Sequence, residues 1–257
     1  MDRKYSEFYF DKDESIHQVK EIFDALKVNR DEALEKYRGR IYCPECRLAR
    51  LSIRQTRGYL FTSKNNMDAH AEDCSMRYES IGRSGLKTYY HEITEKDAKI
   101  KLQSVLDMLF LRDVDSNNNN INYEEIDERV RESNPFTKVN NEGERKYLPH
   151  ISLYSNNINE YLDLMTIYYG KCKIYFSKDD KSKKIYGYIH VLSEKTSDPL
   201  VDIVITNPVK DYIDLDFETE IEKAKTYYLS SIMNLSQKGD VYSGALYKSY
   251  FLSFREV

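Results

Sequence analysis

The sequence predicts an α+β protein, with a helical N-terminal region around a small cysteine-containing module and a C-terminal antiparallel β-rich domain. Apolar residues before position 112 mostly follow a helical period, whereas those beyond 150 mostly follow strand patterns. Between them lies a polar stretch with consecutive asparagines at 117–120. We therefore expect a helical region at 1–112 with the module at 40–80, a linker at 113–149, and a β-rich domain at 150–257.

Two helices are expected before the module. The apolar residues of 13–28 recur at the spacing of one helical face: Ile16, Val19, Ile22, Phe23 and Leu26. Asp13 suits the N-cap of this helix. A shorter helix is expected from Asp31 to Tyr37, ended by Gly39.

The module contains two paired spacings typical of metal ligands. Cys43 and Cys46 form a C-x2-C turn, and His70 and Cys74 form an H-x3-C pair after a gap of 23 residues. The turn brings two thiolates to one ion, and residues four apart on a helix lie on one face. Three sulfurs and one nitrogen form a closed four-coordinate set, so we predict structural Zn²⁺ rather than a catalytic ion. The alternative is buried thiols beside a surface histidine.

A hairpin and a helix are expected between and around these ligands. Residues 51–54 alternate as one strand, and residues 58–62 are its expected partner. Asn65 or Asn66 would cap a helix carrying His70 and Cys74. A longer helix is predicted from about Thr94 to 112, where the start resembles a capping box.

Residues 37–46, with their C-P-x-C knuckle, and the downstream segment 70–75 resemble the N-terminal zinc finger of bacterial CoiA-like proteins. The resemblance covers only about residues 37–78 of the 257. It implies that Cys43, Cys46, His70 and Cys74 are zinc ligands, and it agrees with a bacterial or phage origin.

Strands dominate the expected C-terminal domain. They are predicted at 171–176, 184–192, 200–206, 241–247 and 250–255, with Cys172 in the core of the first. One helix is expected between the third and fourth strands, with Phe217, Ile221, Ala224 and Tyr228 on one face. The order β-β-β-α-β-β is that of an OB-fold, although other α+β sandwiches share it.

The module is one-sided in charge. Glu45 is the only acidic residue between 38 and 64, against seven basic ones: Arg38, Arg40, Arg47, Arg50, Arg54, Arg57 and Lys64. Such a surface suits phosphate contacts, so Arg47, Arg50, Arg54, Arg57 and Lys64 are the predicted nucleic-acid-binding residues. The alternative is that these arginines pair with the acidic first helices. The net charge of −4 gives no overall signal for nucleic acid.

The segment from Asp113 to Glu124 resembles a calcium-binding EF-hand loop. Asp113, Asp115, Asn117 and Glu124 occupy positions one, three, five and twelve. Asn118 stands where such loops need glycine, and an asparagine-rich linker matches the pattern by composition. Calcium binding and a plain linker both remain open.

The remaining polar residues carry no recognisable catalytic motif. His190 falls on the same side of its strand as Tyr186 and Tyr188, which we interpret as a half-exposed face of the sheet. Asp202 with Glu222 and Lys225 matches a nuclease pattern only loosely.

We therefore expect a non-enzymatic nucleic-acid-binding protein with low sequence specificity and no small-molecule substrate. A protein–protein interaction adaptor with a purely structural zinc site is the alternative, and a nuclease subunit is a third. The sequence has no run of 18 consecutive apolar residues, so it predicts no membrane span. The N-terminus has no apolar leader, and we therefore expect a cytoplasmic protein.

Overall fold

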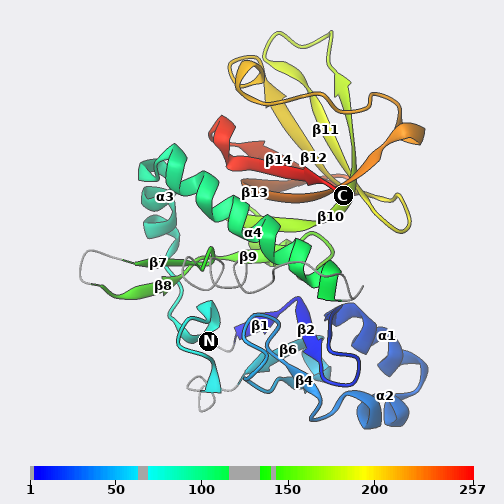
Figure 1. The fold of residues 1–257 in the computed structure, drawn as a ribbon. Coiled ribbons are helices and arrows are strands. Elements are labelled where there is room, and N and C mark those ends of the chain that lie inside the picture. The colour runs from blue at the N-terminus through cyan, green and yellow to red at the C-terminus, as the bar shows by residue number, and fades with distance from the viewer. Residues whose placement is uncertain (1–2, 63–68, 116–133, 140–142) are drawn as a thin grey trace.

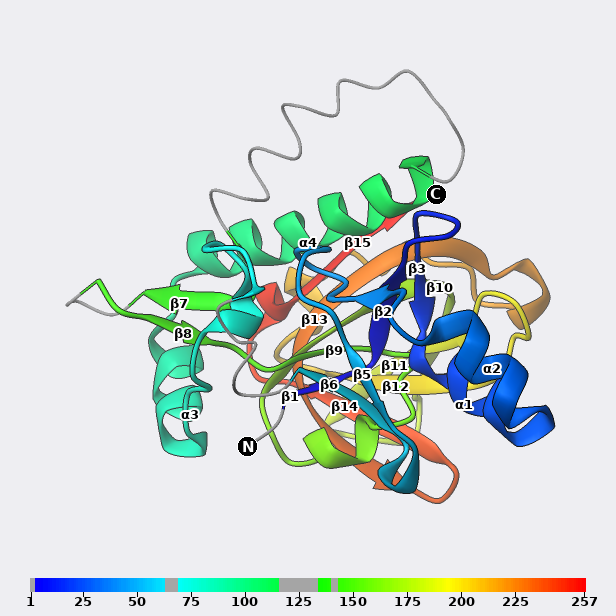
Figure 2. The same cartoon turned by 90° about the horizontal axis from the view of Figure 1, so that it is seen from below.

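The structure, a computed structural model, describes residues 3–62, 69–115, 134–139 and 143–257. It is a mixed α/β protein in which an N-terminal module lies below a group of long C-terminal strands (Figure 1). The long helix α4, Glu95–Asp115, packs against the strands β13 and β15, as Figures 1 and 2 both show. No described helix combines the length and the apolar character that crossing a membrane requires.

The predicted helical N-terminal region is wrong, because this module begins with strands and contains two small sheets. The helix predicted at 13–28 is correct only from residue 19. β1 (Arg3–Tyr5), β2 (Glu7–Phe10) and β3 (Ser15–Gln18) precede α1, Val19–Val28. β3 pairs antiparallel with β2 through a turn in which Glu14 has φ 54°. Gln18, not Asp13, therefore precedes the helix, because sheet pairing overrides the helical spacing of Ile16. α2, Arg30–Tyr37, matches its prediction.

Two small sheets complete this module. β4 (Ile41–Tyr42) pairs with β2, while β1 pairs with β6 and β6 pairs with β5. β5 (Ser52–Arg54) and β6 (Tyr59–Thr62) confirm the predicted hairpin. The core of the module joins aromatic side chains of β1 and β2 to Ile22 of α1 and to Cys43 and Cys74.

The helix predicted from 94 is confirmed as α4, and Oγ1 of Thr94 accepts a hydrogen bond from the Asp97 amide at 3.1 Å. The preceding helix α3, Arg83–Glu92, was not predicted. Within the expected linker, the described residues include β7 (Thr137–Val139) paired with β8, Arg145–Tyr147. The division of the chain into domains stays a prediction.

Five C-terminal strands close into a barrel-like ring. They are β10 (Thr166–Lys178), β11 (Ile185–Ser193), β12 (Pro199–Thr206), β13 (Lys225–Lys238) and β14 (Val241–Leu246). The ring runs β10–β11–β12–β14–β13 and returns to β10. Only the β12–β14 pairing within it is parallel. β9 (His150–Ser152) and β15 (Leu252–Glu256) extend the sheet at its two ends.

Buried aliphatic side chains fill the ring, among them Ile174, Ile189 and Ile203, and Cys172 lies among them as predicted. Four of the strands have the spatial order β13–β10–β11–β12, which is a Greek key. Short 3₁₀ helices occupy several connections: Gln55–Arg57, Ser75–Arg77, Ile158–Tyr161, Lys210–Tyr212, Ile221–Lys223 and Ser249–Phe251.

The helix predicted around 217–228 is wrong. The described chain forms only the 3₁₀ turn Ile221–Lys223 there, and β13 starts at Lys225. β13 is buried on both faces, because Leu229 packs in the barrel while Tyr228 and Ile232 pack in the cluster formed with α4. A strand buried on both faces loses the polar–apolar alternation that identifies strands in a sequence.

A buried polar network joins the N-terminal module to the barrel. Glu7 is 5% exposed, and its Oε2 accepts hydrogen bonds from Tyr169 of β10 at 2.9 Å and from Arg112 of α4 at 3.1 Å. Its Oε1 accepts a third from Gln18 at 3.0 Å. One carboxylate on β2 therefore fixes the position of a barrel strand and of α4.

Glu7→Ala should lower the free energy of unfolding by about 3–5 kcal/mol, because it leaves the Arg112 guanidinium buried without its carboxylate. Urea unfolding followed by circular dichroism measures this change. Asp24→Ala is the matched control, since Asp24 pairs with Lys27 on the surface and its loss should leave the unfolding midpoint unchanged. Equal stability of the two variants would contradict the role of the network.

Candidate metal centre

The structure brings together the four residues that the spacing predicted as metal ligands. One ligand atom from each of Cys43, Cys46, His70 and Cys74 lies within 4.8 Å of the others. The sulfurs of Cys43 and Cys74 are 3.8 Å apart, and Nδ1 of His70 is 3.4 Å from the sulfurs of both Cys46 and Cys74. Three of the residues are buried and Cys46 is half-buried. This donor set can hold one metal ion in four-fold coordination.

Backbone hydrogen bonds shape the turn that carries the first two ligands. The Cys43 amide donates to the Ala49 carbonyl at 2.8 Å, and the Arg47 amide donates to the Cys43 carbonyl at 2.9 Å. Arg47 has φ 57°, so the chain reverses through a left-handed residue just after Cys46. The reversal places both sulfurs on the same side of the turn as His70.

The second pair of ligands lies on turns, so the helix predicted to carry them is wrong. Among the described residues, Ala69 has 3₁₀ geometry, 70–74 form a bend, a turn and irregular backbone, and the short 3₁₀ helix Ser75–Arg77 follows. The expected caps Asn65 and Asn66 lie outside the described residues. A turn satisfies the same requirement as a helix, because the Cys74 amide bonds to the Ala71 carbonyl at 3.2 Å and folds Cys74 back toward His70.

Two hydroxyl groups hold the far nitrogen of the histidine ring. Nε2 of His70 lies 3.2 Å from the Tyr5 hydroxyl and 3.4 Å from Oγ1 of Thr62. A proton on Nε2 leaves the lone pair of Nδ1 facing the three sulfurs, which is the tautomer a metal ligand needs. Sequence reasoning missed both residues, since neither belongs to a ligand motif.

Glu45, the only acidic side chain of the knuckle, turns inward. Its carboxylate accepts hydrogen bonds from the amide and the hydroxyl of Ser75 and from the side chain of Asn134. Burial raises the pKa of Glu45. The carboxylate therefore ties the knuckle to the loop after Cys74 and does not neutralise its outer surface.

The thiols differ in how readily they ionise. Hydrogen bonds from Cys43 and Cys74 hold the pKa of Cys46 far below its usual range. Burial raises the pKa of Cys43, and the hydrogen bonds of Cys74 to the other two thiols raise the pKa of Cys74. Without a cation the cluster therefore favours a single thiolate, and a bound divalent cation would displace the protons of the other two.

The predicted nucleic-acid-binding arginines lie over aromatic rings. The guanidinium carbon of Arg47 is 5.0 Å from the centre of the Tyr9 ring, and that of Arg50 is 5.9 Å from the centre of the Tyr42 ring. Arg54 lies 4.6 Å from the centre of the Phe61 ring. Arg47 and Arg50 are exposed. Lys64 and the side chain of Arg57 lie outside what the structure describes.

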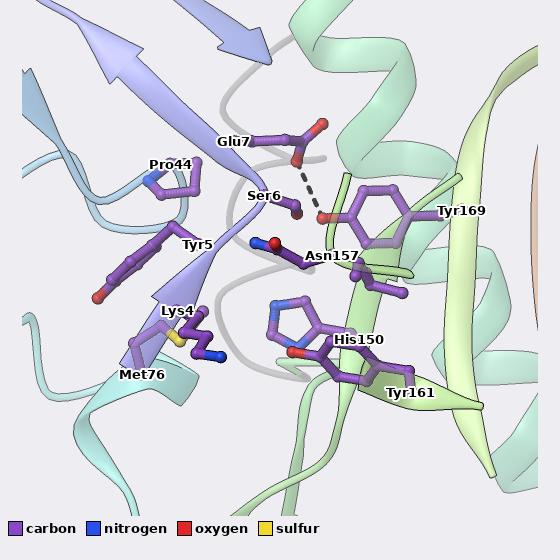
Figure 3. A pocket seen from close by; sticks show the side chains of 11 residues that line it. Lys4, Tyr5, Ser6, Glu7, Pro44, Met76, His150, Asn157, Tyr161 and Tyr169 are labelled. Atoms are coloured by element: carbon purple, nitrogen blue, oxygen red, sulfur yellow. Dashed lines mark hydrogen bonds between the residues drawn. The ribbon is translucent and has the colours of Figure 1, made fainter. Parts of the chain in front are cut away.

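A small cavity lies at the seam between the module and the barrel (Figure 3). Tyr5, Glu7 and Pro44 line it on one side, and His150 and Tyr169 line it on the other. Its volume of about 20 Å³ suits roughly one water molecule, which is too little for a metabolite.

The loop that resembles an EF-hand cannot be assembled from the described residues, because Asn117 and Glu124 lie outside them. The first member of the loop, Asp113, already has two partners. Its Oδ2 lies 2.6 Å from Nζ of Lys171 and accepts a hydrogen bond from Tyr228 at 2.7 Å. The calcium-loop and linker interpretations of this segment both stay untested.

No protein-family model matches this chain, and no curated protein matches it. Of the resemblance to CoiA-like proteins, only the set of three cysteines and one histidine is supported.

Purified protein should contain one metal ion per chain, and Cys43→Ser should lose it because three ligands bind far more weakly than four. Elemental analysis measures the content. Cys172→Ser is the matched control, because Cys172 is buried in β10, away from the cluster, and its replacement should leave the metal content unchanged. Metal-free wild-type protein, or a Cys43→Ser protein that keeps its metal, would contradict the assignment.

Acid should release the metal, because protons compete with it for the three thiolates. Metal affinity should therefore rise with pH, and the sign follows from the raised pKa of Cys43 and Cys74. A chromogenic chelator added during stepwise acidification would report the free ion. Retention of the metal at an equal affinity throughout the acid range would show that thiolates are not its ligands.

Proposed function

We propose that this chain is a zinc-stabilised protein that binds nucleic acid with little sequence preference. The three thiols and one imidazole of the site support zinc as the metal. The arrangement of arginines around the knuckle supports nucleic acid as the partner. The single observation that carries the proposal is a pair of arginines that lie over neighbouring tyrosine rings beside the metal cluster.

Zinc is the metal that fits the cluster best. Bonds of about 2.3 Å to sulfur and about 2.0–2.1 Å to nitrogen, at tetrahedral angles, would put two sulfurs about 3.8 Å apart and sulfur about 3.5 Å from nitrogen. The observed separations are 3.8 Å between Cys43 and Cys74 and 3.4 Å from either Cys46 or Cys74 to His70. Four protein ligands leave no open coordination position, so the proposed role of zinc is structural.

The arginine–tyrosine surface consists of Tyr9, Tyr42, Arg47 and Arg50. Tyr9 and Tyr42 are directly paired on β2 and β4, so their rings lie on the same face of the sheet. Arg47 lies over the first ring and Arg50 over the second. A guanidinium held over a ring by a cation–π contact loses less conformational freedom on binding, and its N–H donors can still reach a phosphate.

The charge around this surface favours an anionic partner. Arg38 and Arg40 belong to the same segment, and the carboxylate of Glu45 is turned inward. Binding to phosphates releases counterions and needs no particular base. The surface is formed by strands and a turn, and none of its residues lies on a helix that could enter a major groove. We therefore propose low sequence specificity.

The barrel gives independent support. A five-stranded Greek-key barrel is the architecture of the OB-fold, which commonly binds oligonucleotides or oligosaccharides. The ring β10–β11–β12–β14–β13 has five strands and contains a Greek key. The OB-fold assignment is therefore part of the proposal, although the helix expected between the third and fourth strands is replaced by the described 3₁₀ turns.

A protein-interaction adaptor is the second candidate. Leu48 is 63% exposed at the tip of the knuckle, between Arg47 and Arg50, and an exposed leucine suits a protein surface. The two candidates differ in their response to salt. Contacts to phosphates weaken steeply as salt rises, whereas apolar contacts do not.

Replacing Arg47, Arg50 and Arg54 together with alanine should weaken binding to single-stranded and double-stranded nucleic acid alike. The slope of log Kd against log salt should fall by about one unit for each phosphate that the variant no longer neutralises. Fluorescence anisotropy with labelled DNA and RNA at several salt concentrations measures both quantities.

The matched control replaces Lys27, Lys99 and Lys223 with alanine, which removes the same charge from side chains that are 75%, 64% and 61% exposed. This control should bind almost as well as the parent. No binding by the intact protein at low salt, or equal reductions in the two triple variants, would refute nucleic-acid binding through this surface.

A further inference from the structure

Three polar side chains on the outer face of the barrel form a continuous hydrogen-bonded chain. Oγ of Ser177 lies 2.7 Å from Nε2 of His190, and Nδ1 of His190 lies 2.7 Å from Oδ1 of Asp202. The residues come from three consecutive strands, β10, β11 and β12. This is a serine, a histidine and an aspartate in the order and at the distances that nucleophilic catalysis uses.

The register of the sheet brings these residues together. His190 is directly paired with Asp202 on one side and with Tyr175 on the other. Ser177 lies two residues beyond Tyr175, so it faces the same side and is a diagonal neighbour of His190. Their sequence neighbours Phe176 and Ile189 point into the barrel core, which fixes the polar side chains outward.

The hydrogen bonds determine where the protons lie. A carboxylate can only accept, so Nδ1 of His190 carries the proton that Asp202 receives. In the neutral imidazole, Nε2 is then unprotonated and accepts a hydrogen bond from the Ser177 hydroxyl. The Tyr175 ring stacks on the imidazole at a centroid distance of 4.4 Å and an angle of 17°, which holds its plane.

The group is accessible from solvent. The side chain of His190 is 19% exposed and that of Asp202 is 36% exposed. A polar cluster with only a structural role could be built from any residues that form hydrogen bonds. In this cluster, a ring nitrogen that can accept a proton lies 2.7 Å from a serine hydroxyl. That hydrogen bond is what raises the nucleophilicity of serine.

We propose that Ser177 is a nucleophile, that His190 is its general base, and that Asp202 is a positioning residue, in a second site that hydrolyses small carboxylic esters. Ser177 Oγ bonds to the ester carbonyl carbon while its proton passes to His190 Nε2. The ester C–O bond then breaks, and the departing alkoxide takes that proton and leaves as an alcohol. Water next attacks the acyl–Ser177 ester and gives a proton to Nε2. The C–Oγ bond then breaks, Ser177 recovers the proton, and the acid leaves.

This inference is independent of nucleic-acid binding, because none of the three residues belongs to the arginine–tyrosine surface or to the metal cluster. Each proposal can therefore fail without affecting the other.

A tagged alkyl fluorophosphonate tests the nucleophile directly, since serine attack on phosphorus expels fluoride and leaves a stable adduct. We expect one adduct per chain, mapped to Ser177 by peptide mass spectrometry. Ser177→Ala should abolish labelling, and His190→Gln should slow it about a hundredfold or more. Ser236→Ala is the matched control, because Ser236 is exposed on β13 and bonds only weakly, at 3.4 Å, to the Ser243 carbonyl.

Asp202 is tested by two variants. Asp202→Asn should slow labelling strongly because it removes the charge that orients the imidazole, while Asp202→Glu should restore part of the rate. Metal content and the unfolding midpoint of each variant check that it is folded. With p-nitrophenyl acetate, the parent should release a burst of one p-nitrophenolate per chain that Ser177→Ala lacks. Labelling of Ser177 no faster than of Ser236, or equal rates in the parent and His190→Gln, would overturn the proposal.

Discussion

The N-terminal module depends on the convergence of three thiols and one imidazole in a buried space. Cys43 and Cys46 lie on a turn after β4, and His70 and Cys74 lie on turns after β6, so the cluster joins segments from the two small sheets. Three thiols this close together, of which Cys43 and Cys74 are buried, cannot all ionise without a cation. Because three neighbouring thiolates repel one another, the cluster needs a positive charge at its centre. This need makes it a strong site for a divalent metal.

A second constraint transmits this order to the rest of the molecule. Tyr5, which bonds to the histidine of the cluster, is two residues from Glu7, whose carboxylate holds Arg112 and Tyr169. The strands β1 and β2 therefore connect the metal cluster to α4 and to the barrel. This connection gives the seam its small cavity and keeps the arginine–tyrosine surface at a fixed position relative to the barrel.

The spacing of residues along the sequence correctly predicted those elements whose signal lies within a short segment of the chain. The four ligands, α2, α4, the β5–β6 hairpin and the strands β10, β11, β12 and β14 follow from patterns within a few residues of one another. Two of the failures, at β3 and β13, involve long-range pairing. β3 is a strand because β2 pairs with it, and β13 is a strand because β10, β14 and β15 surround it. Neither partner is evident from the segment itself.

The candidate sites show the same limit. The basic character of this segment was evident from composition, but the placement of Arg47 and Arg50 over Tyr9 and Tyr42 depends on the β2–β4 register. Ser177, His190 and Asp202 lie on separate strands and match no catalytic motif. Their only signal in the sequence is that each residue falls at an outward-facing position of its strand. This signal identifies a site only when the register between β10, β11 and β12 is known.

If a metal organises the cationic surface, the most direct measurement is nucleic-acid affinity as a function of metal content. The Kd for a short single-stranded DNA should be measured on the purified protein, after removal of the metal with a chelator, and after addition of stoichiometric zinc. We predict that binding disappears with the metal and returns with zinc. An affinity that does not change when elemental analysis shows the metal to be gone would contradict this dependence of the surface on the metal.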